Sequence, residues 1–354
     1  MLTQEHLQDA VDYGRCFIKL GSPASYIPEL ARVNKYQLGA CIVNLDGTVM
    51  ECGDTRTRFT IQSISKLASL ILAISDKGSD YLFHDKVGVE PTGDPFNSIV
   101  KLETKTKPFN PFINAGAITV ADCIEGNSSE EKFERFLSFV RKLCGDEEIS
   151  LNEAVYLSEK ATGDRNRALA YYLKASGILE GNVEECLDFY FKMCSVNVTA
   201  VDIAQMSAVL ANHGACPVTQ EELIPKESAK EVRALMLTCG MYDGSGEFAM
   251  TVGFPAKSGV GGGILAVADK KMGIGIFGPT VWASASLVLR WTKRATASAV
   301  SKFWSISPRT WISISFSKNK KLPDGELFIF TVRQCVCHSG RSSGAVPVRS
   351  EHTG

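Results

Sequence analysis

The chain has few histidines, almost no net charge and no long apolar run, and each shortage argues against a class of function. Five histidines are scattered over 354 residues, so they do not form a metal constellation. Cys335, Cys337 and His338 lie close together but have no second pair of ligands, which argues against a structural zinc. The formal net charge is −1, and a chain so balanced is not expected to bind nucleic acid or an anionic membrane.

The sequence also lacks the marks of a membrane or secreted protein. Its apolar run at residues 67–74 is too short to span a bilayer, and no signal peptide opens the chain. The eleven cysteines follow no regular spacing, which favours reduced thiols over a disulfide framework. We therefore expect a cytoplasmic protein, with a chain long enough for a large core divided into two lobes.

Tryptophan is missing from most of the chain, because Trp282, Trp291, Trp304 and Trp311 are the only four. Charge changes at the same place. Residues 1–280 hold 27 of the 38 Lys and Arg and 36 of the 39 Asp and Glu, a balance of −9, whereas residues 281–354 have a balance of +8. This shift predicts a domain at 1–279 and an atypical tail at 280–354.

Strand patterns flank a helical middle. Residues 38–44 and 48–52 are short apolar runs around a Leu-Asp-Gly turn, as in an antiparallel hairpin, and residues 264–268 and 272–277 alternate as two further strands. The chain between about 76 and 230 has mostly helical patterns.

This order predicts an α+β fold in which a mixed, mainly antiparallel sheet is flanked by helices and carries an inserted helical lobe. The sheet lobe is expected at about 1–62 and 230–279, the helical lobe at about 63–229, and the site between the lobes.

A Ser-x-x-Lys pattern, Ser63 to Lys66, stands at the head of the apolar helix at residues 67–74. Three residues are a little under one helical turn, so the two side chains share a face and a proton can pass between them. A serine needs a neighbouring base, and a buried lysine can be that base because desolvation disfavours its ammonium form. Taken alone, so short a pattern more often marks an ordinary helix with a serine cap.

A second motif, Lys257-Ser258-Gly259, precedes three more glycines and a strand pattern. Lys-Ser-Gly on a strand beside a nucleophilic serine is the third element of penicillin-recognising serine enzymes. The two motifs are chemically complementary, and together they favour a serine acyl-transfer enzyme.

Several polar residues between these motifs are open to two interpretations. Asn114 stands before small residues that open a helix, so its amide can cap its own backbone, which is the favoured interpretation, or face a cavity. Glu159 and Asn166 are seven apart and point the same way if both are helical. Tyr172 and Tyr190, taken singly, are expected to be core aromatics.

At six places the chain resembles the serine-dependent glutaminase family, in matching order over roughly residues 5–279. The matching segments are residues 62–66 (QSISK), 110–118 (NPFINAGAI), Glu159 with Arg165-Asn166, 187–190 (LDFY), 239–243 (CGMYD) and 257–264 (KSGVGGGI).

The resemblance implies hydrolysis of L-glutamine to L-glutamate and ammonia on a β-lactamase-like fold, without a cofactor. It implies Ser63 as nucleophile, Lys66 as its base and Tyr242 as an aid to proton transfer, with the N–H groups of Ser63 and Val260 as oxyanion hole. Family members commonly form homodimers or homotetramers. Positions that match residues holding the amino acid are Gln62, Asn114, Glu159, Asn166, Tyr172 and Tyr190, and Tyr26 matches a tyrosine that closes over it.

Two other functions remain open at this point. A β-lactamase-like or transpeptidase-like enzyme shares the Ser, Lys and Lys-Ser-Gly elements, but this chain lacks the Ser-Asp/x-Asn element. The second alternative is a catalytically dead glutamine-binding protein, favoured if the altered C-terminus prevents completion of the fold.

The tail departs from the family after Gly278-Pro279. Family members continue with Leu-Asp-x-x-Gly-Asn-Ser and a final helix. If the codons of residues 289–316 are shifted to start at their third base, Trp291-Thr292 and Trp311-Ile312 each force an aspartate. Permitted codons then restore Leu-Asp and Gly-Asn-Ser in register, followed by an amphipathic acidic helix. We therefore predict that the tail is out of frame and poorly ordered; a divergent basic segment is the alternative.

Overall fold

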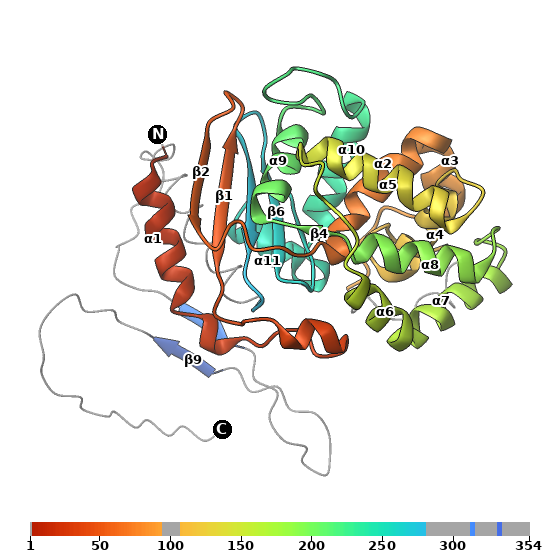
Figure 1. Ribbon diagram of the computed structural model, residues 1–354, viewed down its shortest axis with the longest axis horizontal. Helices are drawn as coiled ribbons and strands as arrows, with labels where there is room; N and C mark the ends of the chain where they lie inside the picture. Colours follow the sequence, from red (N-terminus) through yellow and green to blue (C-terminus); the bar gives the residue numbers. More distant parts are fainter. Residues whose placement is uncertain (1, 94–106, 281–311, 316–330, 335–354) are drawn as a thin grey trace, which may run out of the picture. The chain divides into compact units, whose positions relative to one another are not determined.

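A five-stranded sheet is built from the two ends of the main domain, as the sequence predicts. The computed structural model describes residues 2–93, 107–280, 312–315 and 331–334 (Figure 1). The strand order is β2-β1-β7-β6-β5, and every neighbouring pair in this sheet is antiparallel. Its strands are β1 (Gly39–Asn44), β2 (Val49–Gly53), β5 (Ala256–Ser258), β6 (Gly263–Ala268) and β7 (Met272–Phe277).

Helices and two short strands, β3 and β4, make up most of the other described elements of the main unit. Before and just after β1 and β2 come α1 (Gln4–Arg15), η1 (Ile18–Leu20), η2 (Pro28–Arg32), β3 (Phe59–Thr60), η3 (Gln62–Ile64) and α2 (Ser65–Lys77). The middle of the chain forms α3 (Ser79–Tyr81), the π-helical turn η4 (Leu82–Lys86), α4 (Asn114–Cys123), α5 (Ser129–Cys144), α6 (Glu153–Thr162), α7 (Asp164–Ala175) and α8 (Val183–Cys194). Then follow β4 (Asn197–Val198), which pairs with β3, α9 (Ala200–Ala211), α10 (Lys226–Cys239), η5 (Tyr242–Gly244) and α11 (Ser245–Thr251).

The two faces of the sheet bury different apolar clusters, because successive side chains along a strand point to opposite sides. Ile42 and Ile274 lie opposite each other in the β1–β7 register and pack with α1 and α11. Val43 and Val267 belong to the larger cluster with α9 and the helices beyond it. In Figure 1, α1 lies on one side of the sheet and most of the helices lie on the other.

Helix α9 packs directly on β7, at two glycines. A Cβ at Gly273 would lie 2.1 Å from the Ala208 nitrogen, and one at Gly275 would lie 2.0 Å from the Ala200 carbonyl oxygen. The absence of side chains therefore lets helix and strand backbones touch. A capping box at Thr199 and Asp202 fixes the start of α9.

The helical middle of the chain is interrupted between Glu159 and Asn166, which point the same way only if both lie on one helix. Glu159 lies on α6 and Asn166 on α7, and Gly163 separates the two helices. A Cβ at Gly163 would lie 2.5 Å from the Phe191 ring, so the break is also a close contact with α8. The seven-residue spacing therefore does not place the two side chains on one helix.

The described residues fall into two units, divided after Ala299. In the second unit, β8 (Ile312–Ser315) and β9 (Thr331–Gln334) pair antiparallel. The rest of the predicted out-of-frame tail after Thr280 lies outside the described residues. Over the described ranges, none of the helices has the length and apolar character needed to cross a membrane.

Candidate active site

Ser63 lies in the 3₁₀ turn η3, which runs directly into α2. Only 7% of the residue is exposed, and its side chain hydrogen-bonds with the Tyr242 hydroxyl. The preceding residue, Gln62, has a φ of 47°, a left-handed conformation that is uncommon for a residue with a side chain. Such local strain is often found where a side chain is held in place for function.

Lys66 is fully buried one turn further along, in the first turn of α2. Its Nζ donates to the Phe112 carbonyl oxygen at 3.1 Å and to Asn114 Oδ1 at 2.8 Å. Burial lowers the pKa of Lys66 from 10.5 to about 8. A lysine with this pKa is partly neutral near physiological pH, as a general base requires.

Asn114 does not cap its helix, and this part of the sequence interpretation is wrong. Ile113 is the N-cap of α4, and no side chain caps that position. The Asn114 amide instead accepts from Lys66 and donates from Nδ2 to Asn166 Oδ1 at 2.9 Å. The residue therefore joins α2, α4 and α7 at one point, with its amide turned to side chains of other helices.

Glu159 brings a buried carboxyl group to the same region. Gln62 Nε2 donates to its Oε2 at 3.4 Å, a long hydrogen bond, and only 7% of Glu159 is exposed. Burial raises its pKa from 4.5 to about 7, against the opposing effects of Gln62 and Lys66. A carboxylate held in this way has few partners within the protein and is suited to a cationic group of a ligand.

Besides Tyr242, the sequence singles out three tyrosines, and two of them lie near Glu159. Tyr190 is 2% exposed, and burial raises its pKa, with smaller effects from Glu159, Tyr242 and Tyr26. Tyr26 is 56% exposed as a residue, yet its hydroxyl end is buried. This burial raises its pKa, and the charge of Glu159 is the second largest cause. Tyr172, half-buried on α7, packs against the main apolar core.

The glycine-rich turn after β5 packs against the segment that leads to Ser63. A Cβ at Gly259 would lie 2.7 Å from the Ile61 carbonyl oxygen, and one at Gly261 would lie 2.3 Å from that of Thr60. These glycines hold Val260, half-buried between them, beside the start of η3. The predicted oxyanion-hole residues therefore come from two segments in backbone contact.

Lys257, the first residue of the Lys-Ser-Gly motif, is a second buried lysine. The sequence alone assigns it no role. It is fully buried, its Nζ donates to the Ser258 carbonyl oxygen at 2.6 Å, and it lies 4.1 Å from the centroid of the Tyr242 ring. Burial, and then the charge of Lys66, lower its pKa. The Lys-Ser-Gly pattern was the signal that could have identified it.

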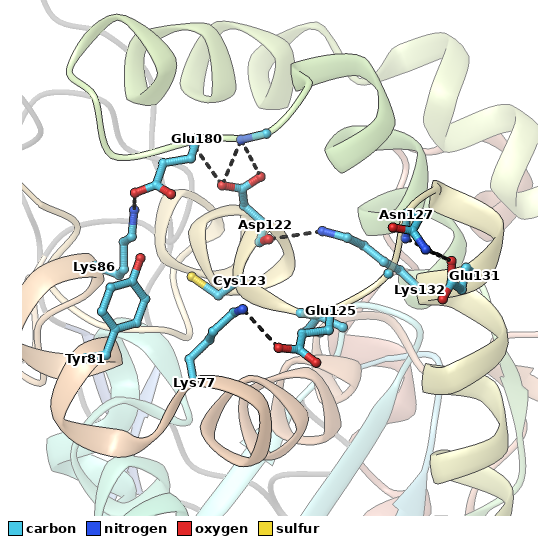
Figure 2. A pocket seen from close by; sticks show the side chains of 13 residues that line it. Lys77, Tyr81, Lys86, Asp122, Cys123, Glu125, Asn127, Glu131, Lys132 and Glu180 are labelled. Carbon is cyan, nitrogen blue, oxygen red and sulfur yellow. Dashed lines mark hydrogen bonds and ion pairs between the residues drawn. The ribbon is translucent and has the colours of Figure 1, made fainter.

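A cavity of about 540 Å³ lies elsewhere, where α2 and α4 end (Figure 2). Its lysines already have partners. Figure 2 shows Lys86 pointing to Glu180 and Lys77 to Glu125. The two ion pairs measure 2.5 Å and 3.1 Å, and Lys132 donates to two backbone carbonyls near the end of α4. We place the chemistry at Ser63, because there several buried ionisable groups with shifted pKa values converge.

A sheet of antiparallel strands with helices on both faces, and a buried lysine one turn from a serine, define a serine hydrolase of the β-lactamase-like class. The residues predicted for the site come from distant parts of the chain, and hydrogen bonds and a cation–π contact connect Ser63, Tyr242, Lys66, Asn114 and Asn166. Within the described ranges, no cluster of three or more His, Cys, Asp or Glu side chains is placed to hold a metal ion.

Comparison with known proteins identifies the family. The family model described as Glutaminase matches residues 21–285. Glutaminase 2 of Clostridium perfringens is 55% identical over 277 residues, which cover 78% of this chain and 90% of that protein. The chain therefore belongs to the glutaminase family, hydrolases that act on the amide of glutamine.

Two solved structures of Bacillus subtilis proteins resemble this fold. A probable glutaminase complexed with 6-diazo-5-oxo-L-norleucine is 42% identical, with a TM-score of 0.77 over 86% of this chain and 97% of that chain. A covalent complex of a glutaminase with 5-oxo-L-norleucine, formed by reaction with the diazo compound, is 41% identical, with a TM-score of 0.73 over 84% and 98%. The predicted β-lactamase-like fold is confirmed.

Proposed function

We propose that this chain hydrolyses L-glutamine to L-glutamate and ammonia through an acyl-enzyme on Ser63. The observation that carries the proposal is Lys66, whose burial lowers its pKa to about 8 one turn from the serine. Neutral Lys66 takes the Ser63 proton as the serine oxygen attacks the amide carbon of the substrate. The N–H groups of Ser63 and Val260 donate to the oxyanion that forms.

The intermediate then collapses, and the bond from the carbonyl carbon to nitrogen breaks. Ammonia leaves with a proton passed from Lys66 through the Tyr242 hydroxyl, which hydrogen-bonds with Ser63. Water attacks the ester, gives its proton to the same base and releases glutamate. Ser63 regains its proton, so protein and base return to their starting states and no other reactant is needed.

The substrate is selected by residues that pair with the two charges of a free amino acid, its α-ammonium and its α-carboxylate. The Glu159 carboxylate pairs with the α-ammonium, because it is buried with only a long hydrogen bond from Gln62. Asn114, Asn166 and the Tyr190 hydroxyl are donors for the α-carboxylate, and Tyr172 completes that side. Tyr26, whose hydroxyl end points inward, closes over the bound amino acid.

The Bacillus subtilis complexes support this assignment. 6-Diazo-5-oxo-L-norleucine is an amino acid with a reactive carbonyl in the side chain, and its product is covalently bound to the relative. Such a molecule needs a site for an amino acid and a nucleophile beside its side-chain carbonyl, which are the two features proposed here.

The experiment uses the full chain with L-glutamine and measures ammonia. Ser63→Ala is expected to abolish ammonia release while it keeps glutamine binding, measured by isothermal titration. The diazo compound should label wild type at the peptide that contains Ser63 and leave the variant unlabelled. Appreciable turnover by Ser63→Ala would remove the serine from its role.

Two other outcomes distinguish the alternatives. Turnover of nitrocefin without turnover of glutamine would favour a penicillin-recognising enzyme. A thermal shift with glutamine but no ammonia would favour a binding protein, an outcome to consider because the family match ends at residue 285.

We further propose a cytoplasmic homodimer or homotetramer, with the site between a sheet lobe and a helical lobe. The nine described cysteines are all free thiols, which supports a reducing compartment. Light scattering of the purified chain measures the oligomeric state.

A further inference from the structure

The Asp188 carboxylate on α8 accepts hydrogen bonds from three different helices. Ser129 Oγ on α5 lies at 2.7 Å, Tyr156 OH and Lys160 Nζ on α6 at 2.5 Å each, and Lys192 Nζ on α8 at 2.7 Å. Burial acts to raise the pKa of Asp188, but these donors outweigh it and lower the pKa. The carboxylate is therefore charged and ties α5, α6 and α8 together.

Apolar packing and the N-cap also hold α6, because Tyr156 lies in the main core and Asn152 accepts from the Val155 N–H at 3.0 Å. The buried residues of α6 are Val155, Tyr156 and Glu159, while Leu157 is 59% exposed. Val155 belongs to a small apolar cluster with Ile27 and Leu30 rather than to the main core. Apolar packing is not directional, so it does not by itself fix the rotation of a helix about its axis.

Further polar ties of α6 lie at its two ends and at the site, and at the N-terminal end Asn152 donates to Asn197 at 3.1 Å. Arg167 on α7 donates to the Lys160 carbonyl oxygen at 2.7 Å, and Gln62 reaches Glu159 at 3.4 Å. By comparison, two side chains of α6 make bonds of 2.5 Å with Asp188. Tyr156 and Lys160 are four residues apart and so on one face, and two short bonds from one face to a single carboxylate restrain the rotation of the helix about its axis.

That rotation decides where the Glu159 carboxylate lies. Glu159 is adjacent to Lys160 in sequence and extends from the same short helix. With its carboxylate about 6 Å from the helix axis, a rotation of about 10° would move the group by about 1 Å. A misplacement of this size costs up to about a hundredfold in a site that depends on geometry.

We propose that Asp188 is a positioning residue that sets the rotation of α6 and thereby holds Glu159 where the α-ammonium of the substrate binds. The inference rests on the role of Glu159 in the proposed function. Asp188 itself touches no reacting atom; it acts through Tyr156 and Lys160.

The test measures KM and kcat separately for variants of the Asp188 network. Asp188→Asn keeps the shape but cannot pair with both lysines, and it should raise the KM for glutamine and the Ki for glutamate about tenfold each. We expect kcat to stay within about threefold, because Ser63, Lys66 and Tyr242 lie on other elements. Loss of folded protein alone would lower the apparent kcat and leave KM unchanged, so a rise in KM reports positioning.

Glu130→Gln is the matched control. Glu130 also pairs with Lys192, at 2.5 Å, but its side chain is 73% exposed and makes no contact with α6 in this network. We expect both constants to remain at wild-type values. Lys160→Met removes one of the two bonds that α6 makes with Asp188 and leaves those of Tyr156, Ser129 and Lys192 in place. It should raise KM in the same direction as Asp188→Asn, and it decides the question if that variant fails to fold.

The failure of this inference can be told from failure of the proposed function. If Glu159→Gln leaves KM unchanged, the assigned role of Glu159 is wrong, and the proposal for Asp188 is overturned with it. If Glu159→Gln raises KM but folded Lys160→Met and Asp188→Asn do not, the proposal for Asp188 alone is overturned. An equal rise of KM in Glu130→Gln would also overturn it.

Discussion

The Lys66 ammonium nitrogen lies 2.8 Å from Asn114 Oδ1, and this bond joins the first turn of α2 to the first residue of α4. The Phe112 carbonyl oxygen is a second acceptor at 3.1 Å. A neutral amine has two N–H donors and one lone pair. The two acceptors can hold both donors, which leaves the lone pair for the proton of Ser63.

The first prediction concerns this proton. Because the pKa of Lys66 is about 8, its neutral fraction and the activity should rise from pH 6 to pH 9, with a midpoint near 8. Lys66→Arg should lose about 10²–10⁴-fold in kcat, as much as Lys66→Ala, since a guanidinium does not release its proton. Lys230→Arg, an exposed lysine, is the control. An arginine variant with a tenth of wild-type activity would contradict the assignment.

The second prediction concerns the binding of the α-ammonium. Glu159→Gln should weaken the binding of glutamate, and of glutamine in a Ser63→Ala background, by about 2–5 kcal/mol. Isothermal titration measures both affinities. Glu153→Gln makes the same change at an exposed position of the same helix and should have no effect. If kcat falls while both affinities hold, Glu159 belongs to the catalytic step.

The third prediction concerns stability. Burial raises the pKa of Glu159 from 4.5 to about 7, so between these values the folded chain binds more protons than the unfolded chain. Its contribution to stability therefore falls as pH rises through this window. Glu159→Gln, which stays neutral, should raise the Tm of the ligand-free chain more at pH 8 than at pH 5. Thermal unfolding at the two pH values measures it, and an equal gain at both would contradict the expected cause.

The fourth prediction uses two glycines. A Cβ at Gly261 would lie 2.3 Å from the Thr60 carbonyl oxygen, so Gly261→Ala must push the turn that holds Val260 away from Ser63. We expect kcat to fall about 10²–10³-fold, as after the loss of an oxyanion-hole donor. Gly246→Ala is the control, because nothing lies within 4 Å of its Cβ. Equal activity of the two variants would be evidence against the proposed oxyanion hole.

The fifth prediction is that residues after Thr280 are read out of frame. Thr280 is buried, and its hydroxyl has no hydrogen-bond partner among the residues that the structure describes, a conflict expected where a chain leaves its original sequence. Sequencing the transcript across codons 275–295 tests this. A frame that matches this chain without interruption, together with a protease-resistant tail, would rule the idea out.

Elements whose structure depends on residues close together in the sequence could be predicted from sequence patterns. The bounds of β7 follow from alternation between turn residues, and the hairpin of β1 and β2 follows from its Leu-Asp-Gly turn. The placement of Lys66 one turn after Ser63 follows from helical spacing alone. In each case the interacting residues are close in sequence, so the backbone geometry is enough to bring them together.

Contacts between distant segments were not predictable in the same way. The amide of Asn114 could satisfy its own helix or a partner, and only the position of Lys66, 48 residues earlier, decides between them. The break at Gly163 depends on the Phe191 ring, which belongs to another helix. Lys257 lies over the Tyr242 ring because β5 brings it there, and no sequence spacing encodes that distance. The role of Asp188 likewise depends on helices that meet only in the folded chain.

The contact of α9 with β7 limits which substitutions the chain can accept. At Gly273 and Gly275 a single added carbon would overlap backbone atoms of the helix, which cannot move away as a flexible side chain can. These two positions are therefore closed to nearly every substitution, although they take no part in chemistry. Among descendants of this chain, the two glycines should be as invariant as the nucleophile. Invariance alone would therefore not distinguish residues that react from residues that make space for the backbone of a neighbouring helix.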